Sequence, residues 1–393
     1  MKPTTPYYVI DLRELDGGFA SLKRALGQHW PNSIVGYSYK TNALPWIIRH
    51  FDNLGCYAEV VSSDEYELAR LVGVADEKII YNGPVKTMET FYDALSKGCI
   101  VNIDSHREIH WLQDSPIARV GVGIRVNFDL ERACPGHSQC GEAGGRFVFC
   151  LENGEFERAL HGIEEAGAEL RGLHLHVSSK TRSLEVYRAI ARTACSIVRD
   201  YGLSLTYVDV GGGFFGGVPG KPSFNDYISL LANELSEEIS PQETALIIEP
   251  GISLVGAPIS YVTEVTDVKK TIHGRFVVTD GSRTSIDPLM HKSSYEHVAA
   301  FKGEDDRAII DRQVVCGFTC MEGDRLFTAV GEREFKTGDI IEYKKVGGYT
   351  MCLTPLFIRY FPDVYVDDGG DLYKVRSAWT ANEFAMGDTG ADS

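Results

Sequence analysis

The sequence lacks the features that mark a membrane protein or a nucleic-acid-binding protein. No stretch approaches the roughly 18 consecutive apolar residues of a membrane-spanning helix. The N-terminal segment MKPTTPYYVIDLREL has no apolar core followed by a small-residue cleavage site. Positive charge is scarce as well, since 39 Lys and Arg stand against 55 Asp and Glu, for a formal net charge of −16. Such a chain repels phosphates. We therefore expect a cytoplasmic protein whose partners are neither nucleic acid nor membrane.

Cysteine is too sparse and too scattered for a disulfide framework. The chain has nine Cys, an odd number, spread from Cys56 to Cys352, which fits reduced thiols. The segment ACPGHSQC brings Cys134, His137 and Cys140 close together in sequence. Their spacing matches no familiar zinc pattern and a fourth ligand is missing. We expect no metal site.

Strand-like and helix-like segments alternate through the first two thirds of the chain. A length of 393 residues suits two domains, or a barrel of about 250 residues with an appendage. Eight short apolar or β-branched runs are separated by segments of helical periodicity, as in repeated βα units. This pattern favours a closed (β/α)8 barrel of the alanine racemase type over an open doubly wound sheet. The eight runs are residues 34–39, 56–61, 78–83, 99–104, 120–127, 170–177, 205–210 and 245–250.

The pattern changes after Gly251. Short β-prone runs separated by Gly and Asp indicate a second, mostly antiparallel β domain. The N-terminal run 6–12 is also strand-like, and we expect it to pair with that domain. We predict a cofactor-binding barrel over 32–258, and a β-rich domain from 1–31 plus 259–393 that completes the active site. The later runs are residues 259–270, 274–281, 312–318, 325–330 and 339–346.

Polar residues stand where the predicted barrel strands end. Because the carboxyl ends of barrel strands meet at one mouth, these side chains are expected to converge there. Each residue alone has an ordinary explanation, such as a solvated lysine, a core histidine or a loop carboxylate. Their shared position makes a common site the better interpretation. The residues are Lys40, Glu59, Asn82, Asp104, Arg125, His176, Gly211 to Gly213 and Glu249.

An aldehyde cofactor that carries a phosphate would use all of these groups. A Lys amine can hold the aldehyde as a Schiff base. A Gly-rich turn and the Ser179 hydroxyl can bind phosphate oxygens. A carboxylate beside a pyridine nitrogen favours the protonated ring, which draws electrons from the α-carbon of the substrate. A flat imidazole can cover one face of the ring.

An ordered series of motifs along the chain resembles one family, the fold-type III pyridoxal-phosphate decarboxylases. This family includes diaminopimelate, ornithine and arginine decarboxylases and shares its barrel with alanine racemase. The resemblance covers nearly the whole chain, and the motifs are specific as a set rather than singly. They are SYKTN, AEVVSSDE, IIYNGPVKT, LHLHVSS, DVGGGFFGG, EPGISLV, CGFTCMEGD and VGGYTM.

The resemblance implies pyridoxal 5′-phosphate as cofactor and gives roles to residues of the barrel. Lys40 would form the Schiff base, His176 would stack on the ring, and Glu249 would meet the pyridine nitrogen. Glu59 and Arg125 are further cofactor-site candidates.

The resemblance also implies a phosphate site and a shared active site. Ser179 with the glycines of the seventh strand end would hold the phosphate, and Tyr349 would reach it from the second domain. Gly251 is a further candidate near the cofactor. Cys320 resembles the thiol that enters the partner subunit's site in these homodimers and protonates the carbanion left when carbon dioxide departs. The glycines are Gly211, Gly212 and Gly213.

Two departures from the family pattern concern the substrate. Ile252 stands where the family has an Arg after EPG, and Met321 stands where it has an acid after the loop Cys. Both changes remove charge from where diaminopimelate or ornithine would need it. The expected substrate is therefore an amino acid or an amino-acid-containing biosynthetic intermediate, whose identity the sequence leaves open. The candidate substrate contacts are Arg283, Tyr295, Glu322 and Asp324.

Two other functions fit the same fold. In an alanine racemase a different run usually follows the Lys than the KTNALPW found here, and the EPG and GGGF motifs are absent. A non-catalytic regulator related to the decarboxylases would have no need to retain Lys40, His176, Glu249 and Cys320 together. We therefore expect a decarboxylase, with racemase and regulator as alternatives.

Overall fold

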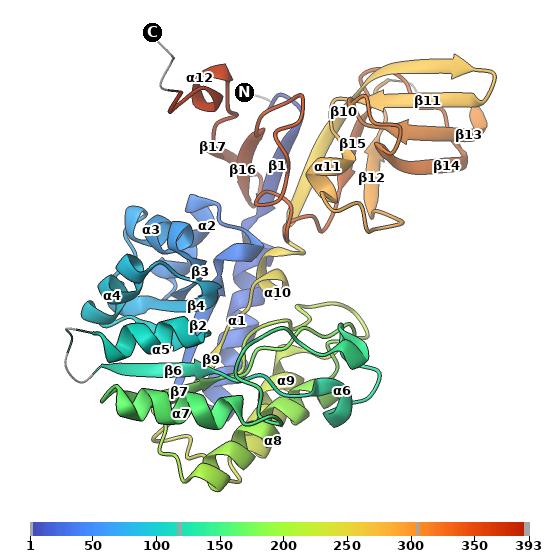
Figure 1. Cartoon of the computed structure of the whole chain (residues 1–393). Helices are drawn as coiled ribbons and strands as arrows, with labels where there is room; N and C mark the ends of the chain where they lie inside the picture. Colours follow the sequence, from blue (N-terminus) through green and yellow to red (C-terminus); the bar gives the residue numbers. More distant parts are fainter. Residues whose placement is uncertain (1–2, 116, 118–119, 304–305, 389–393) are drawn as a thin grey trace. The chain divides into compact units, whose positions relative to one another are not determined.

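The computed structural model describes residues 3–115, 117, 120–303 and 306–388 (Figure 1). The chain forms two compact units. One consists of Met1–Gly17 with Leu254–Ser393, and the other of Gly18–Ser253. The sequence prediction placed the two divisions further along the chain, after residues 31 and 258.

The unit Gly18–Ser253 is built on a closed barrel of parallel strands, β2 to β9. Each strand pairs with the next along the chain, and β9 pairs with β2 through the register Ser33 to Leu246. This closure confirms the predicted (β/α)8 barrel and excludes the open sheet. The strands are β2 (Ser33–Ser38), β3 (Tyr57–Ser62), β4 (Ile79–Val85), β5 (Ile100–Ile103), β6 (Gly121–Arg125), β7 (Glu169–His174), β8 (Tyr207–Asp209) and β9 (Ala245–Ile248).

Helices connect the strands and lie outside the ring that the strands form (Figure 1). Hydroxyl side chains at several strand-to-helix junctions cap them. Ser62, Thr87 and Ser105 each accept a backbone N–H of the first helical turn, which satisfies one of its unpaired donors. Among the described residues, no helix is long and apolar enough to cross a membrane. The helices are α1 (Leu12–His29), α2 (Pro45–Asn53), α3 (Ser63–Leu71), α4 (Met88–Ser96), α5 (His106–Gln113), α6 (Leu130–Ala133), α7 (Glu155–Glu165), α8 (Leu184–Tyr201), α9 (Phe224–Leu235) and α10 (Ile252–Val255), with the 3-10 turns η1 (Tyr39–Thr41), η2 (Asp76–Lys78) and η3 (Gly141–Ala143).

The inside of the barrel holds an apolar cluster of Ile80, Tyr207 and Ile247. The Tyr207 ring fits there because neighbouring strands carry glycine beside it. A Cβ built on Gly172 would lie 2.2 Å from Cε2 of Tyr207, well inside van der Waals contact. The glycine in β7 is therefore a packing requirement of the barrel interior.

The second unit is a mostly antiparallel sheet in the order β14-β13-β11-β10-β1-β16-β17, with β12 and β15 off this path. The N-terminal strand β1 pairs antiparallel with β10 and parallel with β16, which confirms its predicted pairing with the later strands. Three strands, β12, β16 and β17, were not predicted. The elements are β1 (Tyr7–Asp11), β10 (Ile259–Thr271), β11 (Gly274–Thr279), α11 (Arg283–Ile286), β12 (His297–Ala300), β13 (Ile309–Cys316), β14 (Arg325–Arg333), β15 (Ile340–Tyr343), β16 (Asp363–Asp368), β17 (Asp371–Arg376) and α12 (Ala381–Phe384).

Substituting Gly172→Ala is expected to destabilise the protein by about 1–3 kcal/mol, because the new methyl group overpacks the Tyr207 ring. The matched control is Gly27→Ala in α1, where a Cβ meets nothing within 4 Å. That change should stabilise the helix by about 0.5–1 kcal/mol. Urea titrations followed by circular dichroism measure both. Equal effects at the two positions would contradict this packing explanation.

Candidate active site

The carboxyl ends of the barrel strands bring ionisable and amide side chains together at one mouth. Each of these residues lies at the end of a strand, inside it or within two residues after it. Most are buried, whereas Lys40 and His176 are partly exposed. The structure thus assembles the predicted barrel residues and adds two that were not singled out, His174 and Asp209. The set is Lys40, Glu59 in β3, Asn82 in β4, Asp104 after β5, Arg125 in β6, His174 in β7, His176 after it, Asp209 in β8 and Glu249 after β9.

The Lys40 amine is held by a buried carboxylate. Its Nζ lies 2.5 Å from Oε2 of Glu59, and the Ser38 hydroxyl donates to the same oxygen at 2.5 Å. The Glu59 side chain is 1% exposed and that of Lys40 is 34% exposed. The amine is therefore fixed in position on one side and accessible to a small molecule on the other.

Glu249 lies in the same hydrogen-bond network. The Nδ2 atom of Asn82 donates to Oε1 of Glu249 at 2.5 Å and to Oε1 of Glu59 at 3.1 Å. Nε2 of His174 lies 3.5 Å from Oε2 of Glu249. The Asn82 amide thus links Glu59, the acid beside Lys40, with Glu249.

Asp209 and Glu249 are neighbouring buried acids whose pKa values are pushed in opposite directions. Burial raises the pKa of Asp209 well above its ordinary value, and the nearby Glu249 raises it further. His174, Asp209 and Glu249 each place a ligand atom within 4.8 Å of the others, and two buried carboxyl groups this close disfavour a charge on both. Burial alone would raise the pKa of Glu249, but attraction to His174 and Lys40 holds it below its usual range. Asp209 therefore keeps the proton and Glu249 is the anion.

His176 is an uncharged imidazole. Desolvation by the surrounding protein, together with the positive charges of Arg125 and Lys40, lowers its pKa to about 3. Its Nδ1 accepts a hydrogen bond from the Gly212 amide at 3.2 Å. Nη2 of Arg125 donates to the His176 carbonyl at 2.6 Å. The ring is thus neutral and fixed in orientation.

The turn after β8 can only be built from glycine. Gly211 and Gly213 have positive φ values of 71° and 88°. A Cβ on Gly212 would lie 2.0 Å from the Glu249 carbonyl oxygen. Gly251 meets a similar limit, because its Cβ would lie 2.1 Å from Oγ1 of Thr41, next to Lys40. These glycines let the backbone at the mouth pack closely against His176, Glu249 and Thr41.

A cavity of about 440 Å3 adjoins His176 and lies between it and the loop 127–147. Ser179 lies just after the lining residues, and its Oγ accepts the Arg182 amide at 3.0 Å, which leaves the hydroxyl proton to donate elsewhere. Both carboxylate oxygens of Asp104 and Nε of Arg125 are buried without a hydrogen-bond partner among the described residues. The mouth therefore offers an amine, an anion, a glycine turn and unsatisfied polar atoms, which together fit pyridoxal phosphate.

In the antiparallel unit, Asp287 organises two of the residues predicted to bind substrate. Its Oδ2 accepts the Tyr295 hydroxyl at 2.8 Å and Nη2 of Arg283 at 3.2 Å. Nη2 of Arg283 also donates to the carbonyls of Met290 and Lys292. Nothing in the sequence marks Asp287 beyond its position in DGSRTSIDP.

The loop that carries Cys320 is organised by Asp324. The Asp324 carboxylate is buried and accepts Ser282 Oγ at 3.0 Å, the Arg283 amide at 2.7 Å and Thr319 Oγ1 at 2.6 Å. Cys320 is exposed. It lines a cavity of about 370 Å3 in this loop.

Two further predicted residues of this unit lie at its surface. Glu322 is 95% exposed and pairs with Arg325 at 3.3 Å. Tyr349 is also exposed, and its backbone has a φ of 57°, which is uncommon outside glycine.

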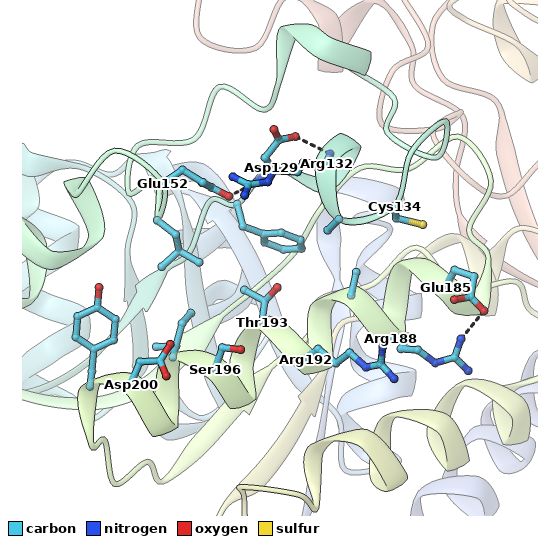
Figure 2. A pocket seen from close by; sticks show the side chains of 16 residues that line it. Asp129, Arg132, Cys134, Glu152, Glu185, Arg188, Arg192, Thr193, Ser196 and Asp200 are labelled. Carbon is cyan, nitrogen blue, oxygen red and sulfur yellow. Dashed lines mark hydrogen bonds and ion pairs between the residues drawn. The ribbon is translucent and has the colours of Figure 1, made fainter.

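A groove on the outside of the barrel is the setting of Figure 2. It encloses about 710 Å3 beside α8 and α6 and carries charges of both signs. Two of its arginines are paired with one carboxylate, since Nε of Arg188 and Nε of Arg192 lie 2.9 Å and 2.7 Å from oxygens of Glu234. The groove lies apart from the lysine and the acidic residues at the barrel mouth, and we assign no ligand to it.

Sequence comparison finds relatives among the decarboxylases. Residues 14–256 match the model of the pyridoxal-dependent decarboxylases, in their pyridoxal binding domain. The chain is 26% identical over 393 residues to a probable chloroplastic diaminopimelate decarboxylase of Oryza sativa subsp. japonica, covering 97% of this chain and 79% of that protein. It is 28% identical over 377 residues to a diaminopimelate decarboxylase of Actinosynnema pretiosum subsp. auranticum, covering 93% and 84%.

Solved structures share the fold. The diaminopimelate decarboxylase of M. jannaschii in complex with L-lysine superposes with a TM-score of 0.85 at 22% identity, over 98% of this chain and 92% of that chain. The arginine decarboxylase of Paramecium bursaria Chlorella virus bound to agmatine gives 0.78 at 20% identity, over 93% and 96%. The barrel and the antiparallel sheet thus occur together in known decarboxylases.

The raised pKa of Asp209 predicts a pH dependence of stability. Above about pH 4 the unfolded chain loses the Asp209 proton while the folded protein keeps it, so folding becomes less favourable as pH rises. Asp209→Asn keeps a donor toward Glu249 and removes this titration. The stability of the variant relative to the natural protein should rise by about 1.4 kcal/mol per pH unit. Urea unfolding between about pH 5 and pH 7 measures the slope.

The control for this slope is Asp226→Asn in the capping box of α9. The amide and hydroxyl of Ser223 lower the pKa of Asp226, so its stabilising effect is complete in this range and is lost only in acid. Its curve relative to the natural protein should be flat. A flat curve for Asp209→Asn as well would show that Asp209 is ionised in the folded protein.

Proposed function

The chain belongs to the family of pyridoxal-dependent decarboxylases, and from this premise we propose how its residues bind pyridoxal 5′-phosphate and select a substrate. Like the family, the protein removes carbon dioxide from an amino acid with the help of this cofactor. The observation that carries the proposal is the single network at the barrel mouth that joins the Lys40 amine, Glu59 and Glu249.

Lys40 is the proposed anchor of the cofactor aldehyde. When bound, pyridoxal phosphate supplies a ring that withdraws electrons from the α-carbon of the amino acid. Glu59 fixes the amine through the 2.5 Å contact and compensates its positive charge. Fixing a reactive group before the substrate arrives reduces the entropy lost in the reaction.

Glu249 and His176 are the proposed contacts of the cofactor ring. The anionic Glu249 would accept a hydrogen bond from the ring nitrogen and favour its protonated form. Neutral His176 can cover the ring without repelling that positive charge. Arg125 holds the His176 backbone at 2.6 Å and so acts on the ring through His176.

The phosphate would lie at the glycine turn. Gly211 to Gly213 form a turn without side chains whose backbone N–H groups a phosphate could approach, and Ser179 has a hydroxyl proton to donate. Gly251 lets the chain after β9 approach Thr41. Tyr349 is the proposed phosphate contact from the antiparallel unit.

We propose that the protein is a homodimer and that Cys320 acts in the site of the partner subunit. Exposed thiols can deliver a proton to a carbanion, and Cys320 is exposed. The C-terminal part of the antiparallel unit also exposes many large apolar side chains, which a second copy of the chain would cover. They include Leu353, Phe357, Ile358, Phe384 and Met386.

The substrate is proposed to be an amino acid or an amino-acid-containing biosynthetic intermediate other than diaminopimelate or ornithine. Ile252 and Met321 are uncharged where the family has charged residues, and Glu322 is bound to Arg325. Arg283 and Tyr295, fixed by Asp287, are proposed to form the wall that the distal part of the substrate meets. Buried Asp324 is proposed to hold the loop that contacts it.

Incubating the protein and pyridoxal phosphate with a pool of L-amino acids and diamino acids in heavy water is expected to name the substrate. One compound should lose carbon dioxide and gain one deuterium at the former α-carbon, read by mass spectrometry. Diaminopimelate belongs in the pool because relatives are named for it, and we expect another compound to react faster.

The control for this assay is Lys40→Ala, which should neither show the visible absorbance of the bound cofactor nor change the pool. Deuterium exchange without loss of mass would indicate a racemase. A natural protein that fails to bind the cofactor would contradict the proposed function.

Mixing two inactive variants tests the shared site. Lys40→Ala and Cys320→Ala should each lose most activity, while their mixture, after subunit exchange, should recover up to about a quarter of the natural rate, because half of the dimers contain one intact site. Activity per subunit and sedimentation measure this. No recovery in a mixture shown to form mixed dimers would place Cys320 in its own subunit's site.

A further inference from the structure

A chain of three buried polar side chains crosses the barrel interior and ends at Glu249. The hydroxyl of Tyr207 in β8 donates to Oδ1 of Asn102 at 2.7 Å. Nδ2 of Asn102 in β5 donates to Oδ1 of Asn82 at 2.8 Å. Nδ2 of Asn82 then donates to Glu249 and Glu59. All five residues are buried, so each bond lies in a medium where it is strong and costly to lose.

The chemistry of the groups allows one direction only. An ionised carboxylate accepts hydrogen bonds and cannot donate them, so Asn82 must turn its NH2 group toward Glu59 and Glu249. Its oxygen then faces Asn102, which must also present its NH2 group. The oxygen of Asn102 faces Tyr207, whose hydroxyl supplies the donor. The orientation of every amide is therefore set.

The barrel backbone makes room for this chain. A Cβ on Gly123 would lie 1.9 Å from Oδ1 of Asn102 and 2.1 Å from the Tyr207 hydroxyl. Gly172 clears the Tyr207 ring in the same way. The neighbouring strands β6 and β7 thus each have a glycine beside Tyr207, whose hydroxyl bonds Asn102.

We propose that Asn82 is a positioning residue that holds the carboxyl groups of Glu249 and Glu59 in place and keeps Glu249 ionised, with Asn102 and Tyr207 fixing the direction of its amide. This inference rests on the proposed function, in which Glu249 meets the cofactor ring and Glu59 holds Lys40. Two carboxylates bonded to one nitrogen repel each other, and the N–H groups between them offset that repulsion. Without them, Glu249 would take up a proton or move away.

An amide suits this task because it does not titrate. The other groups that face Glu249 and its neighbours change charge with pH or carry a fixed charge of their own, whereas Asn82 donates in the same way at every pH. Loss of the donor would make Glu249 a better base, and a proton would pass from the ring nitrogen to Glu249. The charged or titratable groups around the pair are Lys40, Glu65, Asp104, Arg125, His174, His176, Tyr207 and Asp209.

The test follows the protonation of the cofactor ring in Asn82→Leu, which keeps the branched shape of the side chain and removes the donor. The protein is loaded with pyridoxal phosphate labelled with nitrogen-15 in the ring, and the ring nitrogen is titrated by magnetic resonance. In Asn82→Leu the ring nitrogen should lose its proton at a pH lower by about one unit or more. Cofactor affinity should fall by about tenfold.

Two tyrosine variants complete the test. Tyr207→Phe removes only the hydroxyl that begins the chain and should give a smaller shift in the same direction. The matched control is Tyr81→Phe, which removes a buried hydroxyl bonded to Thr90 outside this chain and should titrate as the natural protein does. If Asn82→Leu does not fold, the titration of the ring nitrogen in Tyr207→Phe decides whether the proposal holds.

A ring nitrogen that titrates identically in the natural protein and both network variants would overturn the role of Asn82. A natural protein that binds no cofactor, or whose ring nitrogen is unaffected by Glu249→Gln, would instead overturn the proposed function on which this inference rests.

Discussion

The contact between the Lys40 amine and the buried Glu59 carboxylate, 2.5 Å long, is the constraint around which the barrel mouth is arranged. A carboxylate taken out of water is costly unless its oxygens are bonded. Ser38 and Asn82 supply those bonds. Asn82 in turn bonds Glu249, so the lysine and the second carboxylate cannot be arranged independently. Keeping one amine in place therefore requires donors from several strands, and only a closed barrel brings them together.

The concentration of acids at the mouth is tolerated because one of them is neutral. Glu59, Asp104, Asp209 and Glu249 face only a few positive groups, and Asp209 keeps its proton because it is buried beside Glu249. The anion that remains on Glu249 is the group that a protonated pyridine ring requires. The apolar cluster around Tyr207 closes the barrel interior, so water does not replace these bonds. Stability and chemistry thus depend on the same network.

The strands and the residues at their ends could be predicted from sequence, whereas their partners inside the barrel could not. Eight apolar runs predicted the barrel. Because catalytic residues gather at the carboxyl ends of barrel strands, the positions of Lys40 and Glu249 predicted that both belong to the site. His174 lies two residues before His176 on the same strand face, a signal that was present but not used. Asn82 was noted as polar, yet its bond to Glu249 depends on barrel register. Asp287 belongs to a turn whose shape the sequence does not show.

Lys40 is the proposed carrier of the cofactor, and chemical trapping of the bond between them identifies the lysine directly. The protein is mixed with pyridoxal phosphate and reduced with borohydride, which makes the bond to the amine permanent, and the modified peptide is identified by mass spectrometry. We expect one pyridoxyl group per chain, on Lys40 in the segment GYSYKTNALP. A label on another lysine, or no label in a protein that decarboxylates its substrate, would contradict it.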